Sequence, residues 1–265
     1  MFNPQALVIG FLALTCAALA LVFLTVLGRQ RGRAAPEFLL LVGAAELYAF
    51  GYLGEVAGNS ADAARFWLRV QYIGITFMPA AWLLLSVRHT SLLIRHYRKL
   101  AAAVFSLSAV NLTAYMTDPM HHLFYRSFSW AVREPFAVVV MEPGVWYWIN
   151  IAYLNVTVAA GTVLYARAWL HGGGGLREQA LIMLTGSLFP WAAHILYITG
   201  LVPWNLDPSP PAFAISACFY AWCLFRMRLF DVVPVAHDVI FHELSEAVLV
   251  LDDQYRLMDF NRAAQ

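Results

Sequence analysis

The chain has 265 residues, of which 61% are hydrophobic and only 12% are charged, and nine are tryptophans. A soluble globular chain of this length carries more charge and less apolar surface, so the composition excludes that class and predicts an integral membrane protein. The formal net charge of +1 gives no sign of nucleic-acid binding.

Seven runs of about 20 apolar residues follow one another along the chain, and a helix of this length crosses a hydrocarbon core of roughly 30 Å. No Lys or Arg precedes the first run, and its apolar core is too long for a secretory signal, so we expect it to stay as a helix. The sequence therefore predicts an all-α bundle of seven transmembrane helices, in contact with membrane lipids. The runs cover residues 5–27, 36–58, 66–87, 99–116, 145–169, 179–202 and 210–229.

Basic residues fall unequally on the two sides that these crossings would define. Cytoplasmic loops retain Lys and Arg, so the richer side is predicted to be cytoplasmic. The N-terminus is then outside and the C-terminus is in the cytoplasm, as a multi-pass protein of the inner (plasma) membrane. The richer side carries Arg29, Arg31, Arg33, Arg88, Arg95, Arg98, Lys99, Arg167, Arg177, Arg226 and Arg228, and the other side carries Arg65, Arg69, Arg126 and Arg133.

Residues 117–144 are the one sizeable external segment, and a small β-hairpin is predicted there. The runs "HHLFYRSFSW" and "PFAVVVMEPG" are rich in aromatic and β-branched residues and are separated by the turn-like "REP". Asp118, His121 and His122 could be read as a metal site, but adjacent histidines rarely converge on one ion and no third ligand is obvious. We therefore predict neither a metal site nor a cofactor.

After the seventh run, residues 230–247 are too charged to span a bilayer and predict a signalling linker helix. Pro234 suits the first turn of a helix. An apolar stripe at spacings of seven, four and three predicts the seam of a short coiled coil, through which two copies would form a homodimer. An amphipathic helix lying on the membrane is the alternative. The stripe consists of Val233, Ile240, Leu244 and Ala247.

Residues 248–265 read as the opening of a soluble domain. Apolar residues flank the pair Asp252-Asp253, which predicts a hairpin with a two-residue turn. The stretch "AVLVLDDQYRLMDFNRAA" resembles the first two strands and the start of the first helix of a PAS sensor domain. A PAS fragment of this size cannot bury a core alone, so we expect the chain to be a piece of a longer protein.

Three further stretches carry a resemblance that extends over residues 3–235. They are "RFWLRVQYIGITFMPAAWLLLSVRHT", "TDPMHHLFY" and "LFDVVPVAHDVIFHEL". With them, the chain resembles the seven-transmembrane N-terminal region of bacterial sensor histidine kinases and of some diguanylate cyclases. The resemblance implies a receptor module, residues 1–229, that detects an external or membrane-borne small molecule or lipid. It implies a relay through helix seven to cytoplasmic PAS and output domains and, in a two-component system, to a response regulator. The chain itself shows no catalytic residues.

Two acidic residues fall within the second predicted span. Glu46 lies near its middle and Glu55 lies nearer the outside, and nine residues correspond to half a turn net, so the two carboxylates need different partners. Arg69, at the outer end of the third span, lies at about the depth of Glu55. We predict a Glu55–Arg69 ion pair, either as a clamp between helices or as part of the wall of an outward-facing pocket.

Aromatic and polar side chains cluster in the outer halves of the predicted spans. They could simply hold helices together through hydrogen bonds. They could also line a ligand pocket, in which aromatic walls supply contact area and a few polar groups fix orientation. The residues predicted for that pocket are Tyr72, Trp146, Asn150, Trp191 and His194, beside Glu55 and Arg69.

Other membrane functions fit less well. A retinal-type photoreceptor needs an intramembrane lysine for its Schiff base, and Lys99, the only lysine, falls at a cytoplasmic loop. A small transporter using Glu46 and Glu55 for proton coupling is the alternative function, although no internal repeat is visible. No nucleophile or metal-ligand motif falls within the spans.

Overall fold

The computed structural model describes residues 4–28, 35–133, 136–202, 206–226, 246–251, 257–260 and 262–264. The chain divides into a larger unit that ends at Leu229 and a smaller unit that begins at Phe230. Each unit is a separate structural body, and the candidate site lies within the larger one.

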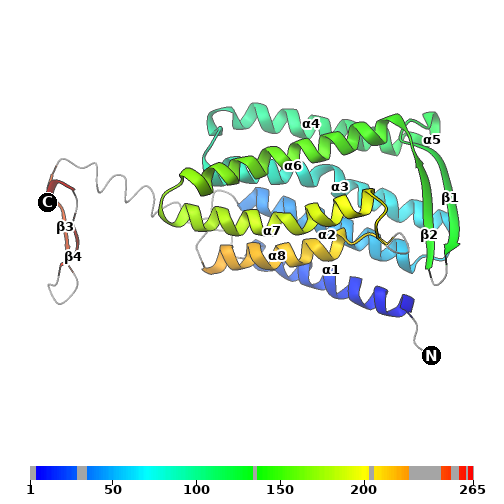
Figure 1. Cartoon of the computed structure of the whole chain (residues 1–265), viewed down its shortest axis with the longest axis horizontal. Helices are drawn as coiled ribbons and strands as arrows, with labels where there is room; N and C mark the ends of the chain where they lie inside the picture. The colour runs from blue at the N-terminus through cyan, green and yellow to red at the C-terminus, as the bar shows by residue number, and fades with distance from the viewer. Residues whose placement is uncertain are drawn as a thin grey trace. The chain divides into compact units, whose positions relative to one another are not determined.

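The described residues of the larger unit form seven long helices (Figure 1). Six of them, all except α8, are long and apolar enough to cross a membrane, which makes this unit a membrane-embedded all-α bundle. The last, α8, packs beside α7 and α1, and its own crossing stays a prediction. The helices are α1 (Pro4–Gly28), α2 (Ala35–Ala57), α3 (Ala61–Thr90), α4 (Tyr97–Met116), α6 (Val145–His171), α7 (Gly174–Ile198) and α8 (Ser209–Arg226).

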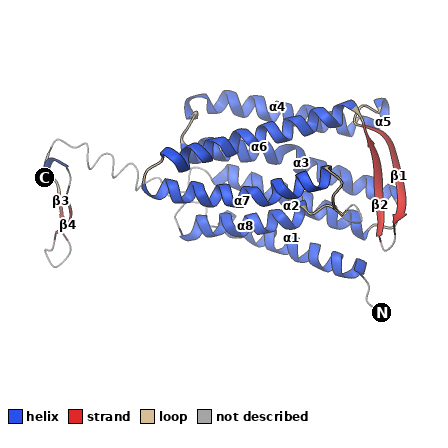
Figure 2. Ribbon diagram, viewed as in Figure 1, coloured by secondary structure: helices blue, strands red, loops and turns tan. Residues whose placement is uncertain are grey.

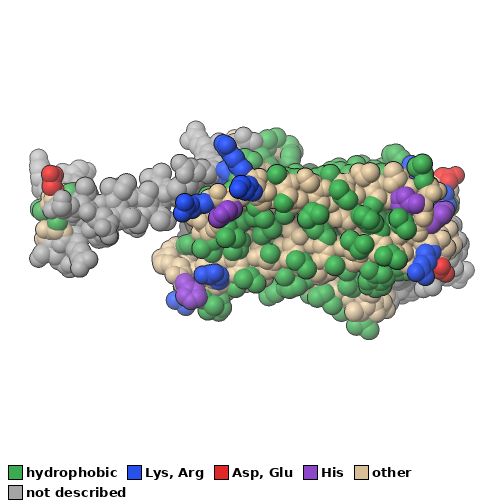
Figure 3. All heavy atoms as spheres, turned by 90° about the horizontal axis from the view of Figure 1, so that it is seen from above, with side chains coloured by type: hydrophobic (Ala, Val, Ile, Leu, Met, Phe, Trp, Pro, Cys, Tyr) green, Lys and Arg blue, Asp and Glu red, His purple; other side chains and the backbone are tan. Residues whose placement is uncertain are grey.

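The outer surface of the bundle suits a lipid environment. Leucine and valine side chains point outward along the helices, with Leu14 70% and Val156 69% exposed. Figure 3 shows hydrophobic side chains over the middle of one face of the bundle, whereas the charged side chains of that face gather at its two ends. This distribution places the ends of the helices in water and their middles in hydrocarbon.

Helices α2 and α3 approach each other closely, and α3 is the most buried of the six spans. Small residues at a helix interface permit such an approach. A Cβ atom added to Gly74 of α3 would lie 2.2 Å from the backbone oxygen of Ala44 in α2. Glycine is therefore required at this position by the packing of two backbones.

A polar cluster joins α2, α3 and α4 at one end of the bundle. The buried carboxylate of Glu37 accepts hydrogen bonds from the Tyr97 hydroxyl and lies 2.9 Å from Nε of Arg88. The Arg88 guanidinium also stacks 4.5 Å above the Tyr97 ring. This is the end that the distribution of basic residues predicts to be cytoplasmic.

The hairpin predicted within residues 117–144 is confirmed at the other end of the bundle, and its external location stays a prediction. Strand β1 (Tyr125–Arg133) pairs antiparallel with β2 (Phe136–Pro143), and Figure 2 shows the two strands across one end of the helices. The short helix α5 (Asp118–His121) leads into this hairpin. The register pairs Phe128 with Met141.

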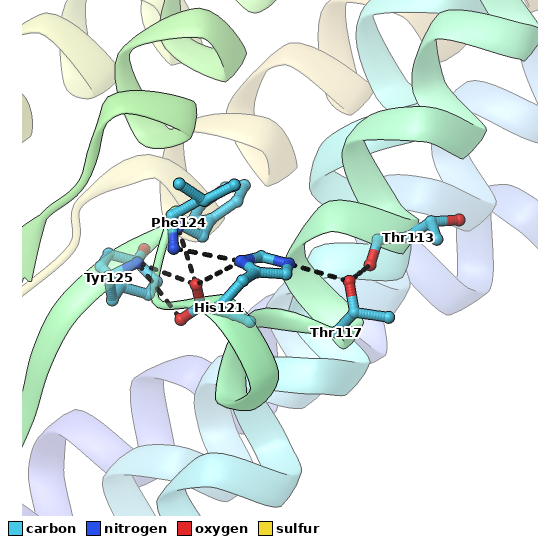
Figure 4. A network of polar contacts seen from close by, with 7 residues as sticks. Thr113, Thr117, His121, Phe124 and Tyr125 are labelled. Carbon is cyan, nitrogen blue, oxygen red and sulfur yellow. Dashed lines mark hydrogen bonds and ion pairs between the residues drawn. The ribbon is translucent and has the colours of Figure 1, made fainter.

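The residues considered for a metal site instead build the entry into the hairpin (Figure 4). The Asp118 carboxylate accepts hydrogen bonds from the backbone N–H groups of Phe124 at 2.7 Å and Tyr125 at 3.2 Å. His121 accepts the N–H of Leu123 through Nδ1 at 3.1 Å, and its Nε2 lies 3.0 Å from the hydroxyl of Thr117. Among the described residues, no three His, Cys, Asp or Glu side chains gather as a set of metal ligands.

The smaller unit contains the two paired strands of the predicted C-terminal hairpin. Strand β3 (Leu249–Leu251) pairs antiparallel with β4 (Leu257–Phe260), and a turn of 3-10 helix follows at Arg262–Ala264. Leu251 pairs with Leu257, and the turn predicted at Asp252-Asp253 lies outside the described residues. The predicted linker helix falls mostly on residues 227–245, which lie outside the described residues.

Candidate functional site

A cavity of about 420 Å³ lies inside the helical bundle. Its walls come from α1, α2, α3, α6, α7 and α8 and from the β1–β2 hairpin, and they are mostly aromatic and aliphatic. A cavity of this size and composition, with a few polar groups, is typical of a small-molecule site. It extends from the hairpin to Trp82 and Tyr220 near the middle of the bundle.

The hairpin borders one end of this cavity through a cluster of aromatic rings. The hydroxyl groups of Tyr72 in α3 and Tyr125 in β1 are hydrogen-bonded to each other. Tyr115 of α4 stacks on Tyr72 with ring centroids 3.6 Å apart, and Phe124 packs edge-on against both rings. Tyr125 and Val139 of the hairpin line the cavity directly. The hairpin is therefore a packed wall of the site.

A buried acid, Asp207, lies in the connection between α7 and α8 and faces the cavity. Its carboxylate accepts a hydrogen bond from the Tyr48 hydroxyl and another from the backbone N–H of Ser209 at 2.8 Å. Its own N–H donates to the Tyr52 hydroxyl at 2.6 Å. Burial raises the pKa of Asp207 above its ordinary value. Asp207 thus links the start of α8 to α2, a role that the sequence analysis missed.

The predicted Glu55–Arg69 ion pair is wrong. The carboxylate of Glu55 accepts a hydrogen bond from Nε2 of Gln71 at 2.5 Å, and no described residue forms an ion pair with it. Arg69 is exposed, whereas Gln71 is 3% exposed. Two residues correspond to about 200° around a helix, so Gln71 points inward and Arg69 points outward.

Five of the seven residues predicted for the pocket line the cavity, and two do not. Arg69 is on the outer face of α3, and Trp146 is turned toward α4, where its Nε1 donates to Asn111 at 3.1 Å. The second carboxylate of α2, Glu46, is also not part of the lining. The cavity brings together Glu55, Tyr72, Asn150, Trp191 and His194, whose part in binding stays a prediction.

Two of these side chains carry buried polar atoms without a hydrogen-bond partner in the described part of the chain. They are Oδ1 of Asn150 and Nε2 of His194. By contrast, Trp191 of α7 donates through Nε1 to Asn155 of α6 at 3.0 Å. This hydrogen bond holds two helices together, which was the alternative role predicted for these polar residues. An unpartnered buried polar atom is costly unless a ligand or water completes it.

Comparison with known proteins gives one clear match. The family model described as the N-terminal 7TM region of histidine kinase matches residues 10–234. No curated protein matches the sequence. The matched region begins within α1 and extends past the end of α8, so it contains every residue that lines the cavity.

Proposed function

Because the chain belongs to the family of N-terminal 7TM regions of histidine kinases, we propose that its bundle detects a small molecule or a lipid inside the cavity. The cavity of about 420 Å³, with unpartnered atoms of Asn150 and His194 in its wall, supports this proposal most strongly. In the proposed orientation the chain crosses the inner membrane seven times, and the hairpin end of the cavity is outside.

The wall of the cavity also suggests how binding is passed to α8. Pro190 lies inside α7, and a proline leaves the carbonyl four residues earlier without its helical donor. That carbonyl belongs to Gly186, and it accepts a hydrogen bond from the Ser216 hydroxyl of α8 at 2.6 Å. Pro190 and Ser216 both line the cavity. A ligand that changes the bend in α7 would therefore move α8.

In the proposed relay, α8 moves the segment that follows it in the sequence. Residues 230–247 would act as a linker helix in a homodimer, and residues 248–265 would begin a PAS domain. Output domains of the longer protein would then pass the signal to a response regulator. Such a receptor needs two states, and a second packing of the helices around the cavity would provide the other one.

A pair of matched substitutions on α6 tests whether the cavity binds a ligand. Ile151 lines the cavity, whereas Ile149 is 48% exposed on the outside of the same helix. We expect Ile151→Trp to fill the outer part of the cavity and to abolish ligand-induced stabilisation, which is about 2.7 kcal/mol at 100 times Kd. The measurement is a thermal-shift screen of metabolites and lipids against the purified protein in nanodiscs.

Ile149→Trp is the control, because it adds the same ring at a lipid-facing position. Compounds that stabilise the wild type should stabilise Ile149→Trp equally and should leave Ile151→Trp unchanged. A screen that yields no stabilising compound, or compounds that stabilise all three proteins alike, would contradict a ligand site in this cavity.

A further inference from the structure

The polar groups of the cavity indicate the charge of its ligand, an inference that rests on the proposed function. Two acidic side chains, Glu55 and Asp207, belong to the lining. Among the described residues that line the cavity, none is Lys or Arg, and His194 is the one basic side chain. A site with this balance is complementary to positive charge.

The atoms that remain available in this wall include two strong hydrogen-bond acceptors. Oδ1 of Asn150 is buried without a partner, on a residue only 2% exposed. Glu55 uses Oε2 to accept from Gln71, and no described residue donates to its Oε1. An ionised carboxylate can only accept hydrogen bonds, and an ammonium group can only donate them, so the two groups are complementary.

Several donors of the same wall are already used within the protein. The Gln71 amide donates to Glu55 at 2.5 Å. The Trp191 indole donates to Asn155 at 3.0 Å, and the Tyr48 hydroxyl donates to Asp207. Trp82 also lines the cavity and its Nε1 has no partner among the described residues, so one neutral donor is open to an anion. The carboxylate of Glu55, by contrast, offers a cation an acceptor of opposite charge.

Aromatic rings supply the other part of the match. Tyr52 is one helical turn from Glu55 on α2, and its hydroxyl lies 2.6 Å from the backbone nitrogen of Asp207, so this ring lies between the two acids. Tyr147, Trp191 and further rings line the same space. Ring faces attract cations and also bury apolar carbon, so they suit an amine with an aromatic or aliphatic body.

We propose that the cavity binds an organic cation, a protonated amine that donates to Glu55 Oε1 and Asn150 Oδ1 while its apolar body lies against the aromatic walls. The ammonium group supplies the counter-charge that the cavity wall lacks. Burying a carboxylate without such a partner is unfavourable. Occupancy by a cation would thus stabilise the outer ends of α2 and α6 together.

Three probes of one shape but different charge test the assignment. Tryptamine is a cation at neutral pH, tryptophol is its neutral counterpart, and indole-3-propionate is an anion. We expect isothermal titration calorimetry on the protein in nanodiscs to show tryptamine binding at least tenfold more tightly than tryptophol, with the propionate weakest. Tenfold corresponds to about 1.4 kcal/mol.

Glu55→Gln should reduce tryptamine affinity at least tenfold while leaving tryptophol within about twofold, since a charge-assisted hydrogen bond to the ligand is replaced by a neutral one. Glu142→Gln is the matched control, because Glu142 is an exposed acid of β2 outside the cavity lining, and it should leave the affinities of all three probes unchanged. Melting temperatures of both variants establish that they are folded.

Equal binding of tryptamine and tryptophol, preference for the propionate, no measurable tryptamine binding, or equal loss in Glu142→Gln would each overturn the cation assignment. The receptor proposal is tested separately by the Ile151→Trp screen. A neutral or anionic compound whose effect disappears in Ile151→Trp would overturn the cation assignment and leave the receptor proposal standing.

Discussion

Gly74→Leu is expected to prevent α3 from packing against α2 and to abolish the cooperative melting transition of the bundle. An added Cβ would lie 2.2 Å from the backbone oxygen of Ala44 and 2.9 Å from the backbone nitrogen of Tyr48. These are backbone atoms, so the clash is relieved only if the two helices separate. Overpacking of a core usually costs about 1–3 kcal/mol, and separation of two central helices would exceed that range.

Separation of α2 from α3 would also remove the hydrogen bond between Gln71 and Glu55. The control is Gly10→Leu in α1, where an added Cβ meets no atom within 4 Å. The purified proteins in detergent are compared by thermal unfolding and size-exclusion chromatography. A Gly74→Leu protein that is monodisperse and melts like Gly10→Leu would show that close α2–α3 packing is not what holds the bundle together.

Asp207→Ala is expected to lower the free energy of unfolding by about 2–4 kcal/mol. The change removes the carboxylate that caps α8 through Ser209, an interaction worth about 0.5–2 kcal/mol. It also leaves the buried hydroxyl of Tyr48 without its acceptor, at a cost of about 1–3 kcal/mol. Asp207→Asn keeps an acceptor oxygen and should lose less than half as much. Chemical unfolding in a mixed-micelle system measures both variants.

The same site predicts a pH dependence with a definite sign. Burial raises the pKa of Asp207, so the folded protein holds this proton more tightly than the unfolded chain does. The contribution of this carboxyl to stability therefore rises as the pH falls through the raised pKa toward the ordinary value of about 3.9. Asp207→Asn should lack this part of the pH dependence, and identical pH profiles for Asp207→Asn and the wild type would contradict the buried-acid assignment.

The sequence predicts the helical elements well, because hydrophobic length is a strong signal in a membrane protein. The predicted span 99–116 nearly coincides with α4 (Tyr97–Met116), and the predicted span 66–87 lies inside α3 (Ala61–Thr90). The aromatic and β-branched run after residue 120 correctly predicts a hairpin.

The details of the site depend on which way each side chain points, and hydropathy does not determine that. Glu55 and Arg69 were expected to face each other, but Arg69 is exposed on α3 and does not line the cavity. Trp146 was predicted in the wall because of its depth, yet it bonds to Asn111 of α4. The direction of each side chain depends on how its helix is rotated and on which helices lie beside it. Both are properties of the tertiary structure.

Asp207 could have been found from the sequence. It precedes Pro208 and Ser209 in "LDPSPPAF", directly before the apolar run of the last helix. An Asp at this position is a common helix-capping signal, and its carboxylate does accept the N–H of Ser209. Its proximity to Tyr48 and Tyr52 was not predictable, because those residues are more than 150 positions away in the chain.

The orientation of the bundle is the central claim, because it decides whether the cavity faces the outside. Met120 of α5 is 85% exposed at the hairpin end, and Leu93, between α3 and α4, is 55% exposed at the opposite end. Single cysteines at these positions, with Cys16, Cys218 and Cys223 replaced by alanine, would be treated with a membrane-impermeant maleimide in intact spheroplasts. We predict that Met120→Cys is labelled in intact spheroplasts and that Leu93→Cys is labelled only after lysis. Labelling of Leu93→Cys alone in intact spheroplasts would contradict an outward-facing receptor.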